Sequence, residues 1–141
     1  MTTVDIVIDS NVLVAGLRSN KGKAFRLLQL VGTGQFITHL SVPLVLEYED
    51  VLLRPELALP VSLAVIEAVI DYHCAVSQHH QIFYLWRPFL RDPKDDMVLE
   101  VAVKAKCDYI VTYNKRDFAG VEQQFGIKIV TPGEFLAQWG E

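Results

Sequence analysis

The chain has few of the residues that build disulfide frameworks and zinc sites. Among its 141 residues it carries two cysteines, Cys74 and Cys107, which stand far apart in apolar or mixed surroundings. We expect both to be reduced thiols of a cytoplasmic protein rather than a disulfide or part of a zinc cluster. None of the four histidines falls in a metal-ligand pair on a predicted helix, which argues against a histidine-based zinc site.

Long apolar runs and an excess of positive charge are missing as well. No apolar stretch is long and uninterrupted enough to span a bilayer, and the first residues contain no basic segment followed by an apolar signal core. We therefore expect a cytoplasmic protein without a membrane-bound part. The formal net charge of −4 argues against a protein that coats nucleic acid, because such proteins are strongly basic. A nuclease is compatible with this charge, since a bound cation offsets a cluster of carboxylates locally.

The sequence does have the composition of a globular α/β protein, and strand and helix patterns alternate along it. Hydrophobic residues make up 51% and charged residues 21%, and the length suits a single domain over residues 1–141. Apolar, β-branched runs alternate with helical patterns, which predicts a parallel sheet covered by helices on both faces. We predict strands at 4–8, 36–38, 109–112 and 127–130, helices at about 23–31, 41–53, 60–73 and 93–106, a last helix from 131 onward, a loop between the first strand and the first helix, and a strand or packed loop at 82–86.

One carboxylate stands directly after the first predicted strand. The run 4–8 is typical of a buried parallel strand, and Asp9 follows it at once. In open α/β sheets, ligands bind just beyond the carboxyl ends of the strands, so Asp9 lies where chemistry would take place. Taken alone, Asp9 is explained equally well as a residue that turns the chain or caps the next helix.

Three further acids fall at positions compatible with the same edge. Glu47 lies on the border of the apolar arc of helix 41–53, Asp96 in the first turn of helix 93–106, and Asp117 in the loop after strand 109–112. Carboxylates gathered at one edge repel one another unless a cation lies between them. Oxygen-only ligands select Mg²⁺ or Mn²⁺ rather than zinc.

Each of these acids also has a simpler interpretation. Glu47 fits a solvated helix position, and Asp117 fits the cap of a following turn. Asp96 begins a polar stripe with i, i+4 spacing that is typical of a salt-bridged surface. Asp92 and Asp95 are explained as caps of helix 93–106, because they flank a proline at its start, and we leave them outside the site.

Five segments in order resemble the PIN-domain family, specifically the bacterial and archaeal toxin ribonucleases of the VapC type. Each is weak alone, but the ordered set is specific and spans nearly the whole chain. The segments are 8–14, 46–52, 91–102, 109–118 and 129–136. The resemblance implies a three-layer α/β/α fold with a central parallel sheet of about five strands.

The resemblance also implies a site and a reaction. Asp9, Glu47, Asp96 and Asp117 would be catalytic, with Asp9, Asp96 and Asp117 binding Mg²⁺ or Mn²⁺. The implied reaction is hydrolysis of single-stranded RNA by metal-activated water. The implied partners are a cognate antitoxin that covers the site and a second copy in a homodimer.

Supporting positions follow from the same resemblance. Asn11 and Thr112 would hold Asp9 and the metal waters in place, and Asn114 stands where some PIN proteins carry an acid. Because asparagine is a neutral and weaker ligand, this departure leaves one or two ions open. Arg18, Lys115 and Arg116 flank the acidic loops, where they either bind RNA phosphates or are solvated surface charges.

Two other functions compete with a nuclease. A phosphotransfer domain also places an aspartate after a strand, but a haloacid-dehalogenase-type phosphatase needs a second aspartate at the position of Asn11. A receiver domain needs a pair of acids at the end of the first strand, where only Asp9 stands. The other alternative is a non-catalytic PIN module that binds RNA or a protein.

Overall fold

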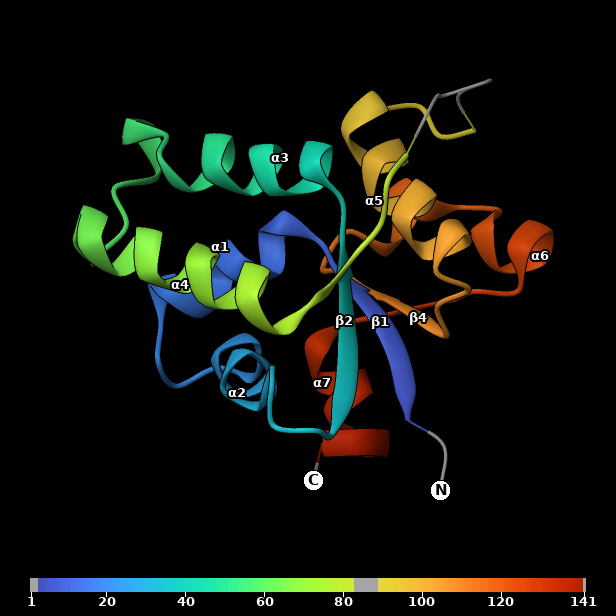
Figure 1. Cartoon of the computed structure of the whole chain (residues 1–141), viewed down its shortest axis with the longest axis horizontal. Coiled ribbons are helices and arrows are strands. Elements are labelled where there is room, and N and C mark those ends of the chain that lie inside the picture. Colours follow the sequence, from blue (N-terminus) through green and yellow to red (C-terminus); the bar gives the residue numbers. More distant parts are fainter. Residues whose placement is uncertain (1–2, 83–88, 141) are drawn as a thin grey trace.

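The computed structural model describes residues 3–82 and 89–140, and within them five parallel strands form a central sheet (Figure 1). The strand order is β3-β2-β1-β4-β5, and every neighbouring pair is parallel. This confirms the predicted α/β class and the parallel sheet. The strands are β1 (Val4–Ile8), β2 (Phe36–Leu40), β3 (Gln78–His79), β4 (Tyr109–Val111) and β5 (Lys128–Val130).

The strand order reverses direction at the centre of the sheet. From β1 the chain moves outward through β2 to β3, and it then returns to the other side of β1 to form β4 and β5. Such a reversal between β1 and β4 is the topological switch point at which open α/β sheets bind ligands, beyond the carboxyl ends of the strands.

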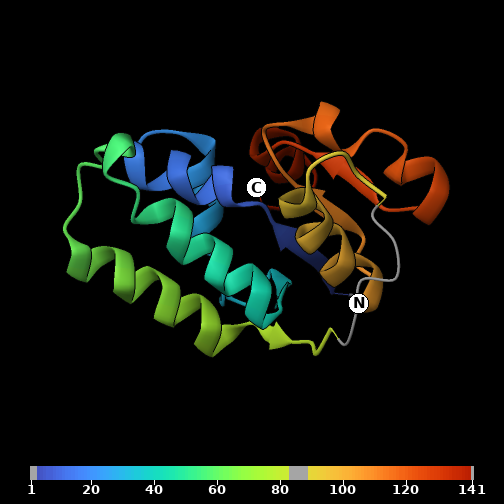
Figure 2. The same ribbon diagram turned by 90° about the horizontal axis from the view of Figure 1, so that it is seen from above.

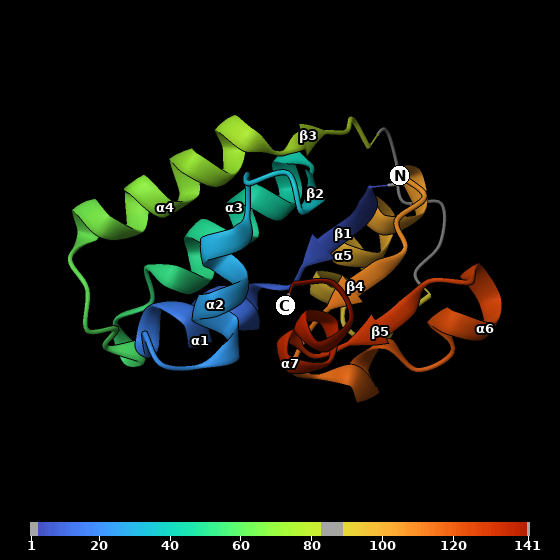
Figure 3. The ribbon, with the colours of Figure 1, turned by 90° about the horizontal axis from the view of Figure 1, so that it is seen from below.

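Helices cover both faces of the sheet, which gives the expected three layers. Alternate residues of a strand point to opposite faces, so that Val7 and Ile110 join one core while Ile6 and Ile8 join the other. The first core is closed by α3 (Val42–Leu52), α4 (Leu63–Val76) and α5 (Pro93–Lys104). The second is closed by α1 (Ser10–Arg18), α2 (Lys23–Leu30) and α7 (Pro132–Phe135), which lie together in Figure 3.

Short elements complete the chain. These are the 3₁₀ turns η1 (Pro55–Leu57) and η2 (Lys115–Phe118), the short helix α6 (Val121–Phe125) and the π-helical turn η3 (Leu136–Gly140). None of the described helices combines the length and the apolar character needed to cross a membrane.

Side-chain caps set several helix starts where the sequence predicts them. The Ser41 hydroxyl accepts a hydrogen bond from the Leu44 N–H at the start of α3. Asp92 accepts one from the Lys94 N–H at the start of α5, and Thr131 forms a reciprocal capping box with Glu134 in α7. Each cap satisfies backbone donors that a helix terminus would otherwise leave without partners.

The predicted loop after the first strand is wrong, because α1 begins directly at Ser10. The β-branched residues there lower helix propensity, but Val12 packs into one core and Leu13 into the other, and tertiary packing overrides the local preference. Two elements also have other bounds than predicted: β2 continues to Leu40, and α4 begins only after its cap Ser62 and continues to Val76. The short strand β3 has no signal in the sequence. The prediction for 82–86 concerns a segment of which 83–86 lie outside the described residues.

Candidate active site at the carboxyl edge of the sheet

Asp9 joins the central strand to the first helix. Its backbone N–H donates to the Val111 carbonyl at 3.0 Å, which continues the pairing of β1 with β4 by one residue. Its Oδ1 accepts a hydrogen bond from the Ser10 N–H at 2.8 Å, so Asp9 is also the N-cap of α1. The residue is 7% exposed and stands at the switch point between β1 and β4. Figure 2 shows α1, α3 and α5 around the end of β1.

Two polar side chains fix the second oxygen of Asp9. The Thr112 hydroxyl donates to Asp9 Oδ2 at 2.8 Å, and the Asn11 amide donates to the same oxygen at 3.3 Å. The Thr112 oxygen in turn accepts from Asn11 Nδ2 at 3.1 Å and from the Asn114 N–H at 3.0 Å. Since a hydroxyl has one proton and two lone pairs, this arrangement uses all of them and aims the proton at Asp9. The structure thus places Asn11 and Thr112 in contact with Asp9, and Asn114 contributes its backbone.

Helix α3 is tied to the end of β1 from the other side. The Tyr48 hydroxyl donates to the Ile8 carbonyl, one residue before Asp9, and the Tyr48 side chain is buried. Burial raises the pKa of this hydroxyl well above its usual value, and the charge of Asp9 adds to the effect. The hydroxyl therefore stays protonated and keeps donating.

Glu47, the residue before Tyr48, reaches the same region from α3. Its side chain is partly buried, and burial raises the pKa of its carboxyl. Lys94 and Arg54 lower this pKa, whereas Asp50 and Asp9 raise it. Glu47 thus lies within electrostatic reach of Asp9 and of the start of α5.

Asp95 is the acid of α5 whose pKa the other carboxylates raise most. Burial and then the charges of Asp9, Asp117, Asp92 and Asp96, in that order, raise its pKa to about 7. The pKa of Asp9 is also raised, first by burial and then, against the hydrogen bonds that lower it, by Asp117 and Asp92. Such mutual repulsion is what carboxylates sharing one site produce. The charges of Asp9 and of the exposed Asp117 of η2 thus both act on Asp95.

Asp96 has hydrogen bonds of its own. Its side chain is 4% exposed, and its Oδ1 accepts from the Phe89 N–H at 3.3 Å and from the Leu90 N–H at 3.0 Å. Its Oδ2 is buried and has no hydrogen-bond partner among the described residues. Asp96 thus holds the segment that precedes α5, while the charge of Asp9 acts on Asp95, one residue earlier.

Sequence reasoning assigned Asp95 to capping, yet the cap is formed by Asp92. A signal that could have found Asp95 is its spacing from the buried residues of α5, since Val98, Leu99 and Ala102 follow it at i+3, i+4 and i+7. That spacing places Asp95 on the stripe that faces the sheet. Two neighbouring helical residues point in directions about 100° apart, so the choice between them matters.

The basic residues proposed for RNA are largely engaged. Arg18 Nη2 donates to the Leu57 carbonyl at 3.0 Å, and Lys115 Nζ lies 3.0 Å and 3.2 Å from the two carboxylate oxygens of Glu134. Arg116 is exposed in η2, beside Asp117. Two of the three cations therefore hold loops near the acidic edge.

The donor set fits a hard divalent cation, although the site is not a ready-made cage. Its ligands would be carboxylate oxygens, which Mg²⁺ and Mn²⁺ prefer, and their mutual repulsion is what a cation relieves. Within residues 3–82 and 89–140, no group of three His, Cys, Asp or Glu side chains is close enough to hold an ion as it stands. Such a site, with few carboxylate ligands, suits Mg²⁺, which usually binds one or two carboxylates and keeps several of its waters.

Comparison with known proteins gives one finding. A family model described as PIN domain matches residues 5–116, which is more than half of the chain. The match runs from β1 into η2 and includes Asp9, Glu47, Asp95 and Asp96, and it ends one residue before Asp117. No curated protein matches the chain.

Proposed function

The chain belongs to the PIN-domain family, and on this premise we propose that it is a metal-dependent endoribonuclease that cleaves single-stranded RNA as the toxin of a toxin–antitoxin pair. PIN domains are generally metal-dependent nucleases. The observation that carries the proposal is the position of Asp9, which Asn11 and Thr112 orient at the switch point of the sheet, and whose pKa is raised by burial and by the charges of Asp117 and Asp92.

We assign the binding of Mg²⁺ or Mn²⁺ to Asp9, Asp95 and Asp117, with Glu47 as the fourth acid. When bound, such an ion lowers the pKa of a water ligand and polarises a phosphoryl oxygen. The hydrogen bond from Thr112 lowers the pKa of Asp9 against the larger rise that burial causes, and so favours the ionised carboxylate that an ion would bind. Assignment of Asp96 as a ligand, as the resemblance implies, is the competing proposal. Its contacts with Phe89 and Leu90 favour a role in holding the start of α5.

The contacts near the acids also indicate which basic side chain binds RNA. Arg116 is exposed beside Asp117, so we assign it to an RNA phosphate, whereas the contacts of Arg18 and Lys115 favour roles in fixing loops. The toxin role, the antitoxin, the homodimer and the cytoplasmic location rest on the resemblance to VapC-type toxins and on composition. The free thiols Cys74 and Cys107 agree with a reducing compartment.

A second function is favoured by one observation. The described residues contain no three-ligand group as they stand, which is what a non-catalytic PIN module that binds RNA or protein would also show. Such a module would bind RNA without turnover and without a divalent ion.

The deciding experiment is cleavage of a mixed single-stranded RNA pool with Mg²⁺, beside EDTA and Asp9→Asn controls. We expect cleavage that both controls abolish, together with Mn²⁺ binding by calorimetry that Asp9→Asn weakens. Cleavage that persists in Asp9→Asn would contradict the proposed site. RNA binding that EDTA leaves unchanged, without any cleavage, would favour the non-catalytic module.

A further inference from the structure

An exposed tyrosine directly follows the residue that donates to Asp9. Tyr113 follows Thr112, the residue that donates to Asp9, and its backbone N–H donates to Asn11 Oδ1 at 3.1 Å. Its side chain is 44% exposed, whereas Tyr48 and Tyr109 are buried in the core. The backbone of Tyr113 is thus part of the network that orients Asp9, while its ring is open to solvent.

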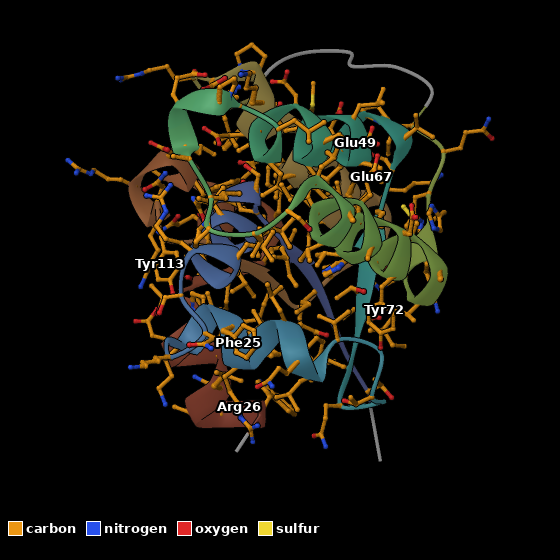
Figure 4. All side chains as sticks on the ribbon, turned by 90° about the vertical axis from the view of Figure 1, so that its left-hand side faces the viewer. Phe25, Arg26, Glu49, Glu67, Tyr72 and Tyr113 are labelled. Carbon is orange, nitrogen blue, oxygen red and sulfur yellow. The ribbon has the colours of Figure 1, made fainter. Side chains whose placement is uncertain are left out.

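The ring of Tyr113 is held at its far end as well. Burial raises the pKa of its hydroxyl, and a hydrogen bond from the backbone of Ala24, near the start of α2, offsets part of the rise. Figure 4 shows Tyr113 on the same face as Phe25, the next residue of α2. With its backbone fixed by Asn11 and its hydroxyl by α2, the side chain keeps few rotational degrees of freedom to lose on binding.

Other exposed aromatic rings are used elsewhere. Phe89 is exposed to a similar degree, but its ring packs edge-on against Phe125 at 5.2 Å between centroids. Trp139 packs against Tyr109, which begins β4 at the opposite edge of the sheet. Among the described residues, Tyr113 makes no such ring contact, and a fixed aromatic face next to a phosphate-cleaving site is the feature on which unpaired bases stack.

We propose that the Tyr113 ring stacks on an unpaired nucleobase next to the phosphate that is cleaved. Tyr113 is then a substrate-positioning residue, and the inference rests on the proposed ribonuclease function. The chemistry is stacking of π faces, so it accepts any base but requires one that is free of a duplex. Tyr113 would therefore help the site to choose single-stranded over double-stranded RNA, without choosing a sequence.

The test measures binding without cleavage. The Asp9→Asn protein, with Mg²⁺ present, is mixed with a fluorescent single-stranded oligoribonucleotide of randomised sequence that carries 2-aminopurine, whose emission falls when it stacks. In this background Tyr113 is changed to Leu, which keeps an apolar side chain without a π face, and to Phe and Trp, which keep the π face. Tyr72→Leu is the matched control, because Tyr72 is 47% exposed on α4 and its hydroxyl donates to Val31.

We expect Tyr113→Leu to weaken binding about 5- to 150-fold and to remove the 2-aminopurine quench, as loss of one stacked base does. Phe and Trp should retain both signals, and Tyr72→Leu should leave both unchanged. In the otherwise native protein, Tyr113→Leu should raise KM for single-stranded RNA more than it lowers kcat.

Three results would overturn stacking. One is binding by Tyr113→Leu equal to that of the parent, which would assign the exposed ring to a protein partner. Another is a Trp variant as weak as the Leu variant. The third is a parent protein that shows no quench. Failure of stacking is separable from failure of the proposed function, because cleavage of RNA by the native protein is measured independently. A cleaving enzyme with an inert Tyr113 refutes only the stacking.

Discussion

Two aspartates on the same central strand have opposite surroundings. Asp5, near the start of β1, lies with Oδ1 at 2.8 Å from Nε2 of the buried His39, and its backbone N–H donates to Asp108. Asp9, just after the end of β1, lies near Asp95 and Asp117, and the pKa of its carboxyl is raised. The protein itself supplies a hydrogen-bond partner for the carboxylate at one edge of the sheet, whereas the charges that raise the pKa of the carboxylate at the other edge are those of acids. A bound cation would bring the opposite charge to that edge.

The neighbours of the two aspartates extend this contrast. At the amino edge, Lys106 and Lys128 line the same cavity of about 500 Å³ as Asp5 and Asp108, so both signs of charge are present. His39 also contacts His80, with 2.8 Å between Nδ1 and Nε2. At the carboxyl edge the neighbours of Asp9 that shift its pKa by charge are both acids. We therefore interpret the amino edge as structural and the carboxyl edge as functional.

The largest expected effect is the loss of RNA cleavage when Asp9 is changed, and the same change of Asp5 is its comparison. Asp9→Asn should lower RNA cleavage by about a hundredfold or more, since a bound ion contributes several kcal/mol to transition-state stabilisation. Asp5→Asn should leave cleavage nearly unchanged and lower the free energy of unfolding by about 1–2 kcal/mol, because it weakens the contact with His39. Single-turnover cleavage and denaturant unfolding measure the two effects. A large loss of cleavage in a folded Asp5→Asn protein would mean that the amino edge of the sheet is also functional.

The next prediction separates the two neighbouring acids of α5. Asp95→Asn should lower Mn²⁺ affinity and cleavage by about 10- to 100-fold while the protein stays folded, because the charges of Asp9 and Asp117 act on Asp95. Asp96→Asn should retain most cleavage, since an amide oxygen still accepts the hydrogen bonds of Phe89 and Leu90. Asp96→Ala should lower the free energy of unfolding by about 1–3 kcal/mol, because buried N–H groups lose their acceptor. The reverse ranking of the two Asn variants would restore Asp96 as the ligand.

These two acids show where sequence reasoning reaches its limit. The strands and most helix starts could be predicted, because β-branched runs and the capping residues Ser41, Asp92 and Thr131 are local signals. The choice between Asp95 and Asp96 depends on the rotation of α5 about its axis, which packing against the sheet decides. Likewise, α1 forms because its residues pack into both cores, and no local pattern reports that.

The position of Tyr113 is a second example of the same limit. The sequence contains many aromatic residues and does not say which lie at the acidic edge. The structure ties Tyr113 to Asn11 through its backbone and leaves the ring exposed, which depends on how the loop after β4 meets α1.

A smaller effect should come from the residues that orient Asp9. Asn11→Ala removes a donor to Asp9 and the acceptor for the Tyr113 N–H, so we expect Mg²⁺ affinity and cleavage to fall about tenfold. Asn114→Ala is the matched control, because Asn114 reaches Thr112 through its backbone N–H, which alanine retains. Calorimetric Mn²⁺ titration and cleavage rates measure both. An equal loss in Asn114→Ala would indicate that the Asn114 amide is itself a ligand, as a second ion would require.

The smallest expected effect is the change in the free energy of unfolding with pH. The pKa of Asp95 rises from 3.8 in a free side chain to about 7, so between these values the folded protein binds a proton that the unfolded chain does not. Stability from this group is therefore present at low pH and lost as pH rises toward 7 and above. The difference in free energy of unfolding between the native protein and Asp95→Asn should become less favourable to the native protein from pH 5 to pH 8. Using this difference cancels the opposite trend of the buried His73, whose pKa is lowered.

Folding stability measured with a cation also compares the two edges of the sheet. Mn²⁺ should raise the melting temperature more at pH 8 than at pH 5, because the ion binds ionised carboxylates and competes with the proton on Asp95. At 100 times its Kd the ion should contribute about 2.7 kcal/mol. Asp5→Asn should keep this metal response, whereas Asp9→Asn should lose it, since Asp5 contacts His39 while the charges that act on Asp9 are those of acids. A metal response that is equal at both pH values, or equal in Asp9→Asn, would mean that stabilisation by Mn²⁺ arises away from the carboxyl edge.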